Sequence, residues 1–397
     1  MATATSGHHP RFSAARREEE RVTPLELFFD LVFVLAITQC TTLMSHNRTW
    51  AGMAEGLLVL GVLWWSWVGY AWLTSVVDPE EDAVRLSIFV AMAGLLIVSL
   101  CVPHAFGDLA LTFAVAYGVV RAAHIALFRL ASRDDAALRR SVTGLAVGAA
   151  IGVGILAAAS LLDGFAQGVL WALAIGLDMA GPYVFGSEGW KLVPAHFAER
   201  HGLIIIIALG ESIVAIGVGA KAGLTAGVAT AAVLGIVLAA ALWWIYFDVV
   251  AIVSSRRLAQ AKEGRERNEM ARDSYSYLHL PMVAGIVLVA LGLKTIIGNV
   301  DDPLETVPAF ALLGGVAAYL LGHVAFRLRQ IHTINTHRLV LALVFVALLP
   351  LAVAIPPLLI LGIVDAVLCG MIVYETRRYG EGRSRLRHPG TAESPVS

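Results

Sequence analysis

The chain has few charged residues and almost no cysteine. Asp, Glu, Lys and Arg make up 15% of its 397 residues, against about 25% in ordinary soluble domains. Hydrophobic residues make up 58%. Cys40, Cys101 and Cys369 lie in apolar runs without metal-ligand spacing, so we expect neither a disulfide nor a metal site. This composition excludes an ordinary soluble domain.

Several signatures of catalysis are also missing. The chain contains no GxxxxGKS or GxxxxGKT loop, no GxGxxG motif after a strand and no HExxH motif. The basic run from Arg256 to Arg272 is interrupted by three glutamates, which favours a solvated helix facing lipid headgroups over a nucleic-acid site. We therefore expect no cofactor, no nucleic-acid partner and no enzymatic activity.

Apolar segments recur along the whole chain. About 20 apolar residues suffice to cross a bilayer. This length predicts about 12 transmembrane helices, near residues 25–44, 54–75, 84–102, 109–130, 142–161, 167–184, 199–220, 225–250, 275–298, 307–329, 338–354 and 357–376.

The distribution of basic residues gives an orientation to these spans. Of the 29 Lys and Arg residues, all but Arg48, Lys221, Lys294 and the intramembrane Arg121 fall on the side that carries both termini. This asymmetry follows the positive-inside rule and places both termini in the cytoplasm. The polar segment 1–20 contains no cleavable signal, so the first span should serve as an uncleaved anchor. Residues 1–20 and 379–397 are predicted to be disordered cytoplasmic tails.

Short patterns in the first half recur in the second. An aromatic pair, an Ala-Gly stretch, a His before Phe and Arg, and an intraspan Asp return in the same order. The matched positions are Trp64-Trp65 with Trp243-Trp244, Ala93-Gly94 with Ala284-Gly285, His124 with His323, and Asp178 with Asp365. This order predicts two parallel six-helix repeats, residues 21–187 and 188–378. The fold class expected is an all-α polytopic membrane protein.

The first span begins with polar residues that have different predicted roles. Thr23 and Glu26 occupy the N-cap and N3 positions of a capping box, so Glu26 is expected to be a structural cap. Asp30 lies one turn deeper, where a charge is costly, and belongs either to a substrate or ion pathway or to a buried ion pair. Asp78 and Arg85 are expected to form a helix cap and an acid–base cluster.

A basic residue lies within the fourth span. Arg121 and His124 are three positions apart and share a helix face. A buried arginine needs an acid, and Asp30 and Asp178 are expected at comparable depth. We therefore expect Arg121 to form a buried pair with Asp30, with Asp178 as the other possible partner. Two interpretations remain: a static packing network, or a proton or ion relay through His124.

The seventh span carries Arg200, His201 and Glu211. Arg200 and Glu211 share one helix stripe, but about 16 Å of helix separates them. Glu211 therefore needs another partner, water or a proton near mid-membrane, and is expected to belong to the pathway. Arg200 and His201 are further candidates. His279, near the start of the ninth span, caps its helix or joins the pathway, and Asp365 is a candidate deep in the last span.

The opening of the chain resembles a known family. Four stretches carry this resemblance: Glu20–Val34; Tyr70–Thr74 with Asp78–Glu81 and Arg85; Glu199–Leu203 with Leu209–Ser212; and Tyr275–Gly285. They are similar to the bacterial low temperature requirement protein A (LtrA) family, over roughly residues 18–378. Ser75 stands where the family pattern often carries Asn. The resemblance implies a multi-pass protein of the bacterial plasma membrane and defines no molecular activity.

Three classes of function remain open. A proton- or ion-coupled secondary transporter of an unknown small solute or ion is favoured by the span number, the parallel repeats and the acids near mid-membrane. The alternatives are a cation or proton channel with two six-helix repeats, and a lipid-modifying membrane enzyme. Uptake that depends on a proton gradient would separate transporter from channel. Besides the lipid bilayer and that solute no partner is indicated, and the oligomeric state is not specified.

The orientation can be tested with reporter fusions. A cytoplasm-active reporter fused after Arg267 should be active, because the segment carrying Arg267 is predicted to be cytoplasmic. A periplasm-active reporter should work after Gly223 or Asn299. Periplasmic activity after Arg267 would refute the predicted topology.

Overall fold

The computed structural model describes residues 21–186, 189–220 and 223–378, which are helical throughout with short connections and no strand. The first half contains α1 (Pro24–His46), α2 (Trp50–Thr74), α3 (Asp82–Cys101), α4 (Ala110–Ala131), α5 (Ala136–Ala159) and α6 (Gly164–Val184). The second contains α7 (Pro194–Gly219), α8 (Ala226–Phe247), α9 (Val250–Gln260), α10 (Arg265–Met270), α11 (His279–Gly298), α12 (Thr306–Ile331), α13 (Thr336–Ala347), α14 (Leu349–Ala352) and α15 (Pro357–Arg378). The all-α polytopic class is confirmed. The predicted disordered tails lie outside the described residues.

The predicted eleventh span differs from the structure. In its place the chain forms the 12-residue α13, breaks at Leu348 and continues as the four-residue α14. Pro350 has no backbone N–H to bond the carbonyl one turn earlier, and the loss of this bond favours a break in the helix at this point. The described part of the chain therefore holds 11 helices long and apolar enough to cross a membrane, and α13 is a shorter apolar helix.

The start of α1 follows the predicted capping box. The Thr23 hydroxyl accepts a hydrogen bond from the Glu26 N–H at 3.4 Å, and a Glu26 carboxylate oxygen accepts from the Thr23 N–H at 2.9 Å. These two bonds satisfy backbone donors that a helix start leaves open. The helix therefore begins at a fixed residue, and Asp30 lies one turn inside it.

The basic segment between α8 and α11 is helical. It contains α9, α10 and a π-helix, Ala271–Tyr277. Ser276 in this π-helix joins the two halves of the chain, because its hydroxyl accepts from the Trp72 indole at 2.9 Å and its carbonyl from the Trp64 indole at 2.8 Å. The wide π turn thus fixes the second half against α2.

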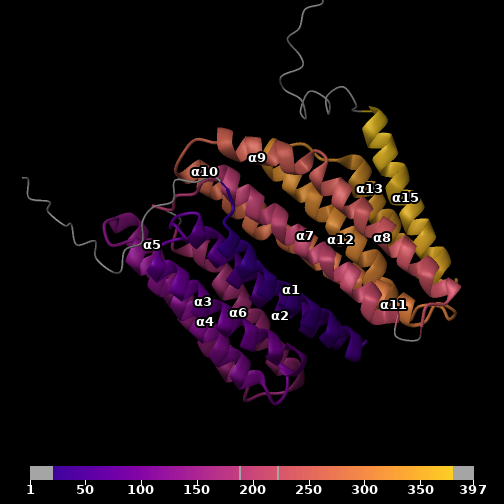
Figure 1. The fold of residues 1–397 in the computed structure, drawn as a ribbon, viewed down its shortest axis with the longest axis horizontal. Coiled ribbons are helices and arrows are strands. Elements are labelled where there is room, and N and C mark those ends of the chain that lie inside the picture. Colours follow the sequence, from indigo (N-terminus) through magenta and orange to yellow (C-terminus); the bar gives the residue numbers. More distant parts are fainter. Residues whose placement is uncertain (1–20, 187–188, 221–222, 379–397) are drawn as a thin grey trace, which may run out of the picture.

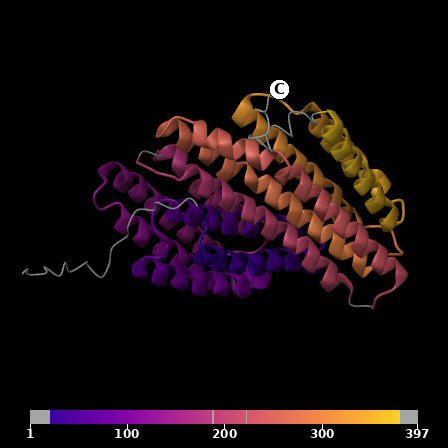
Figure 2. The ribbon, with the colours of Figure 1, turned by 45° about the horizontal axis from the view of Figure 1, so that its top comes forward.

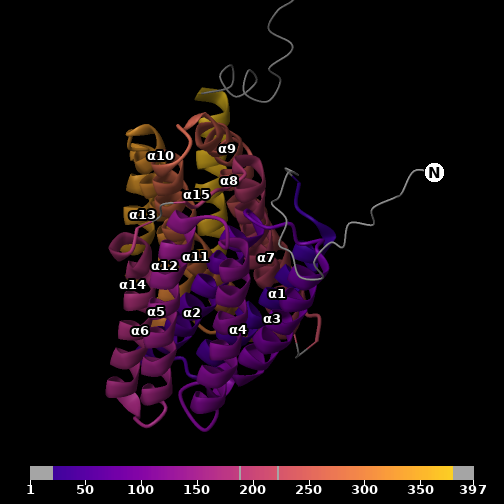
Figure 3. The same ribbon diagram turned by 90° about the vertical axis from the view of Figure 1, so that its left-hand side faces the viewer.

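Corresponding helix pairs pack in both halves. In the first half these are α1–α2, α1–α3, α3–α4, α4–α5 and α2–α6; in the second they are α7–α8, α7–α11, α11–α12, α12–α13 and α8–α15. Figure 1 shows the first half, indigo to magenta, beside the second, rose to yellow, with α1 and α7 along the boundary. Figure 2 shows the same division from another direction, and in Figure 3 the first half lies in front of the second. A parallel duplication would produce this correspondence; the duplication and the cytoplasmic termini stay predictions.

The closest helix crossing in the second half depends on glycine. A Cβ atom at Gly285 of α11 would lie 2.5 Å from the Gly315 carbonyl oxygen and 2.8 Å from the Tyr319 nitrogen of α12. A Cβ atom at Gly315 would lie 2.6 Å from the Gly285 carbonyl oxygen. Both contacts involve backbone atoms, which cannot rotate away. Small residues therefore allow α11 and α12 to touch along their backbones.

Gly285→Ala should destabilise the folded protein by about 1–3 kcal/mol, the usual range for overpacking a close contact. Gly362→Ala is the matched control, because this helical glycine has no atom within 4 Å of the added Cβ. Thermal unfolding in detergent measures both. Equal melting temperatures for the two variants would contradict the tight crossing.

Candidate functional site

Polar residues connect α1 and α7 along the boundary between the halves. Three contacts across this boundary join residues 170 positions apart: Glu26–His196, Asp30–Arg200 and Thr41–Glu211. A constant difference means that both helices advance together, so they run parallel and in register. We call this contact surface the α1–α7 seam.

The first polar level of the seam is a cluster of acids around one arginine. Arg200 lies 2.7 Å from Asp30 and 3.2 Å from Glu26 through different guanidinium nitrogens. His196 Nε2 lies 2.8 Å from the same Glu26 carboxylate, and Trp67 donates its indole N–H to Asp30 at 2.9 Å. Each of these side chains is almost fully buried. The expected cap Glu26 is therefore also a member of this acid–arginine cluster.

The acid–arginine cluster contains more acidic groups than permanently positive ones. It holds two carboxylates, Glu26 and Asp30, and one residue with a permanent positive charge, Arg200. An unbalanced charge in an apolar bundle is costly. Neutrality therefore needs an imidazolium at His196 or a proton on a carboxyl group. The second Asp30 oxygen is buried and has no hydrogen-bond partner among the described residues, so it is one place for that proton.

The second polar level of the seam surrounds Glu211. The hydroxyl groups of Thr38 and Thr41 on α1 each donate to one of its carboxylate oxygens. Lys294 of α11 donates to the Ser45 hydroxyl at 3.0 Å and interacts electrostatically with Glu211. The sequence requires a partner for Glu211 other than Arg200, and the structure supplies two threonines and a nearby ammonium group.

An apolar layer separates the two levels. Along α1 it contains Phe33 and Ile37, and along α7 Ile204 and Ala208, all at most 3% exposed. Asp30 and Thr41 are eleven residues apart, which corresponds to about 16 Å of helix. No charged side chain lies on either helix within this interval. A proton or ion passing along the seam would have to cross this layer.

A second buried ion pair lies inside the first half. Arg121 of α4 donates to Asp178 of α6 at 2.9 Å, while Asp30 pairs with Arg200. The predicted Asp30–Arg121 pair is therefore wrong, and the alternative partner Asp178 takes its place. His124 donates through Nε2 to the Gly69 carbonyl of α2 at 2.9 Å. A Cβ atom at Gly69 would lie 2.8 Å from the His124 ring, which explains the glycine at this crossing.

Three histidines gather in the second half. The rings of His201 and His279 lie 5.2 Å apart, and His279 Nε2 lies 2.9 Å from the Tyr246 hydroxyl. The His323 ring stands 5.9 Å from the Tyr246 ring. His279 also contacts the Ser274 carbonyl through Nδ1 at 3.1 Å, so it satisfies a carbonyl of the preceding π-helix as a cap would. The structure therefore places His201 and His279 together, away from Glu211's threonine partners.

Asp365 differs from its predicted repeat partner. It is 5% exposed on α15, and neither carboxylate oxygen has a hydrogen-bond partner among the described residues. By the spacing that matches His124 with His323, the position equivalent to Arg121 is Leu320. The second half thus contains Asp365, the predicted equivalent of Asp178, but has no arginine at the position equivalent to Arg121.

The remaining predicted cluster is confined to the surface. Asp78 accepts from the Glu80 N–H at 2.9 Å, and Arg85 lies 3.8 Å from the exposed Asp82. Arg85 also donates to the Glu80 carbonyl at 2.8 Å. These contacts close the turn before α3 and bring Arg85 beside an acid. Asp78 does not cap the helix, because the N-cap residue of α3 is Glu81, which makes no side-chain capping bond.

Sequence reasoning did not select three residues of the seam, His196, Thr38 and Thr41, or the neighbouring Lys294 of α11. His196 could have been found, because it precedes Arg200 by four residues and Glu211 by fifteen, on the same helix stripe. The threonines carry no such signal, since hydroxyl groups in a membrane helix usually bond their own backbone.

Comparisons with known proteins identify a family. Residues 21–373 match the family described as bacterial low temperature requirement A protein. The chain is similar to a protein of Rhizobium meliloti (strain 1021), described as uncharacterized, with 30% identity over 309 residues and 75% of each chain covered. No solved structure matches.

The pairing can be tested with a double-mutant cycle. Arg121→Gln alone should lower the free energy of unfolding by about 3–5 kcal/mol, because it leaves Asp178 as an uncompensated buried charge, and adding Asp178→Asn should restore part of this loss. Arg121→Gln combined with Asp30→Asn should instead give additive losses, because these residues belong to different pairs. Thermal unfolding in detergent provides the measurement. Rescue of Arg121→Gln by Asp30→Asn would contradict the observed pairing.

Proposed function

The chain belongs to the bacterial low temperature requirement A family, and from this premise we propose that it is a proton- or ion-coupled secondary transporter of the bacterial plasma membrane. The family description names a growth requirement and no chemistry. The argument for transport therefore comes from the geometry of the α1–α7 seam.

The observation that carries the proposal is the position of Glu211. It is 2% exposed in a membrane-spanning helix, and hydroxyl groups of α1 hold both of its carboxylate oxygens. A hydroxyl group bonds to a protonated or an ionised carboxyl group, because it can donate or accept. Glu211 can therefore gain or lose a proton, or hold a cation, without losing its neighbours.

Glu211 lies at the interface between the two halves, where relative motion of the halves would change its contacts. Glu211 belongs to α7 and its hydroxyl partners to α1, so any displacement between the halves changes its surroundings. Secondary transporters place coupling residues at the interface between repeats, and alternating access moves one repeat against the other. Corresponding helix pairs in the two halves support this arrangement.

The apolar layer of the seam favours a transporter over a channel. Phe33, Ile37, Ile204 and Ala208 fill the interval between the acid–arginine cluster and Glu211. A channel needs a continuous polar or wet path when it conducts. Alternating access instead exposes one site to each side in turn and never opens a continuous path, and the closed layer along the seam supports this interpretation.

Glu211→Gln should leave the protein folded and remove the pH dependence of transport. Glutamine keeps the size of the side chain and its contact with Thr38 and Thr41, but it cannot release a proton. Proton uptake is measured with a pH-sensitive dye trapped in proteoliposomes to which the small solutes of a cell extract are added. Full pH-dependent uptake by Glu211→Gln would overturn the assignment.

The threonines provide a matched control for this measurement. Thr41→Ser keeps the hydroxyl that Glu211 needs, so uptake should stay close to that of the unchanged protein. Thr41→Val has nearly the same shape but no hydroxyl group, and it should reduce uptake at least several-fold, because one carboxylate oxygen loses its partner.

A further inference from the structure

A cleft of about 570 Å³ opens at the end of α6. Its wall includes Pro182 and Tyr183 of α6, Lys191 before α7, and residues of the segment 263–272. Because α6 is long and apolar enough to cross a membrane, its end marks a membrane surface. The cleft therefore lies at the level of the lipid headgroups.

Basic residues outnumber acidic ones in the wall of this cleft. Its described ionisable residues are Lys191, Arg265, Arg267, Arg272, Glu263 and Glu269. Asp273, the acid that Arg272 contacts, also binds Arg329, so these two further residues leave the excess of positive charge unchanged. Such an excess at a membrane surface raises the local concentration of anions.

Arg272 is held in a fixed orientation at the wall. Its Nε donates to Asp273 at 2.8 Å, and its guanidinium carbon lies 3.9 Å from the centre of the Tyr183 ring. The ring and the carboxylate together fix the plane of the guanidinium group. Because Nε makes the bond to Asp273, the terminal nitrogens keep N–H groups for a ligand. The side chain is 12% exposed, so a ligand in the cleft can reach it.

Arg267 is fixed by backbone carbonyls. Its Nε and one terminal nitrogen donate to the Ala261 carbonyl at 3.2 and 3.0 Å. A carbonyl group has no net charge, so Arg267 keeps its positive charge, and its other terminal nitrogen makes no bond to a described residue. Lys191 is exposed and forms no ion pair with a described residue. Two oriented guanidinium groups and an exposed ammonium group are a donor set that suits phosphate.

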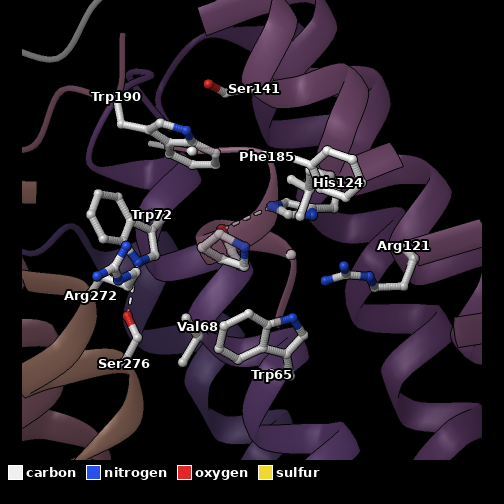
Figure 4. A pocket seen from close by; sticks show the side chains of 15 residues that line it. Trp65, Val68, Trp72, Arg121, His124, Ser141, Phe185, Trp190, Arg272 and Ser276 are labelled. Atoms are coloured by element: carbon white, nitrogen blue, oxygen red, sulfur yellow. Dashed lines mark hydrogen bonds between the residues drawn. The ribbon is translucent and has the colours of Figure 1, made fainter. Parts of the chain in front are cut away.

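A smaller, aromatic cavity adjoins the cleft and does not suit a charged group. It shares Pro182, Gly186, Trp190 and Arg272 with the cleft, and the surface that it exposes is almost entirely apolar. Figure 4 shows Trp190 and Arg272 on the side of this cavity away from Arg121. Apolar surface does not stabilise a charge, so an anion stays on the cleft side of Arg272.

One face of α6 beside the cleft is apolar and exposed. Leu173, Leu177 and Val184 are 46%, 43% and 71% exposed, and their spacing places them on one stripe of the helix. The stripe ends next to Tyr183, which lines the cleft and has the amphipathic side chain typical of a membrane interface. An occupant with a phosphate group and acyl chains fits both surfaces.

We propose that this cleft binds the headgroup of an anionic phospholipid, in the leaflet that the distribution of basic residues predicts to be cytoplasmic. The phosphate group accepts hydrogen bonds from Arg272, Arg267 and Lys191, and an acyl chain lies along the apolar stripe of α6. The excess of positive charge selects a headgroup with net negative charge over a zwitterionic one, whose cation would be repelled by the same arginines. Binding of the lipid does not depend on transport.

The test is native mass spectrometry of the full-length protein in a neutral detergent with short-chain lipids. Phosphatidylglycerol should bind at least about tenfold more tightly than phosphatidylcholine with the same chains, because phosphatidylcholine has no net charge. No preference between the two lipids, or no binding of either, would overturn the proposal.

The deacylated headgroup distinguishes a lipid from a soluble phosphate ester. Glycerophosphoglycerol has the phosphate and the headgroup of phosphatidylglycerol but no acyl chains. It should bind at least about tenfold more weakly than the lipid, because it cannot use the apolar stripe of α6. Equal affinities would overturn the lipid as the occupant and assign the cleft to a soluble phosphate ester.

Matched charge variants locate the site. Lys191→Gln and Arg267→Gln should each weaken phosphatidylglycerol binding about fivefold. Arg257→Gln is the control, because Arg257 is exposed on α9 of the same basic segment but does not line the cleft; it should change the affinity less than about twofold. Lys191 contacts no described residue through its ammonium group, so its variant should fold normally even if Arg267→Gln does not. Equal effects of Lys191→Gln and Arg257→Gln would contradict the location.

Discussion

Arg200 lies fully buried among apolar helices, and its charge must be balanced there. Asp30 and Glu26 supply that balance from α1, the first helix of the chain. A buried charge without a partner would destabilise the bundle by several kcal/mol, so α1 and α7 cannot separate at this level while Arg200 stays buried. The halves of the molecule are thus joined by an electrostatic requirement as well as by apolar packing.

The same requirement explains where the other polar groups occur. Arg121 is balanced by Asp178 within the first half, and Glu211 is held by hydroxyl groups rather than by an arginine. A fixed ion pair resists change, whereas a carboxyl group held by hydroxyl groups accepts either protonation state. The structure therefore combines ion pairs at Arg121 and Arg200 with an acid, Glu211, whose neighbours permit a change of charge.

The sequence predicts the helices well, because a long apolar run has one stable arrangement in a bilayer. The capping box at Thr23 and Glu26 even predicts the residue at which α1 begins. Prediction fails where local chemistry interrupts the apolar pattern, as at Pro350 between α13 and α14. Hydropathy averages over a window and does not register one missing N–H group.

Partners are harder to predict than helices. The depth of Arg121 along its helix follows from the sequence, but two acids lie at similar depth, and only the neighbours of α4 decide between them. His196 can be recognised as a candidate only from its position on the same helix stripe as Arg200. The threonines that bond Glu211 carry no charge, so the sequence does not mark them as polar sites in a membrane. Sequence spacing gives the height of a side chain in the membrane; the packing of the helices gives the direction from which its partner comes.

Because the contacts between α1 and α7 keep a constant sequence spacing, they depend on the number of residues between them in each helix. Each residue turns an α-helix by about 100°, so one inserted residue between Asp30 and Thr41 would rotate Thr41 away from Glu211 while leaving Asp30 in place. A slide of one helical turn, about 5.4 Å, would break all three contacts at once. Single side chains on the seam can therefore be substituted, but no residue can be inserted into or deleted from one helix without loss of the contacts beyond that point. Because sliding breaks all three contacts, the halves should tilt about the seam more easily than they slide along it.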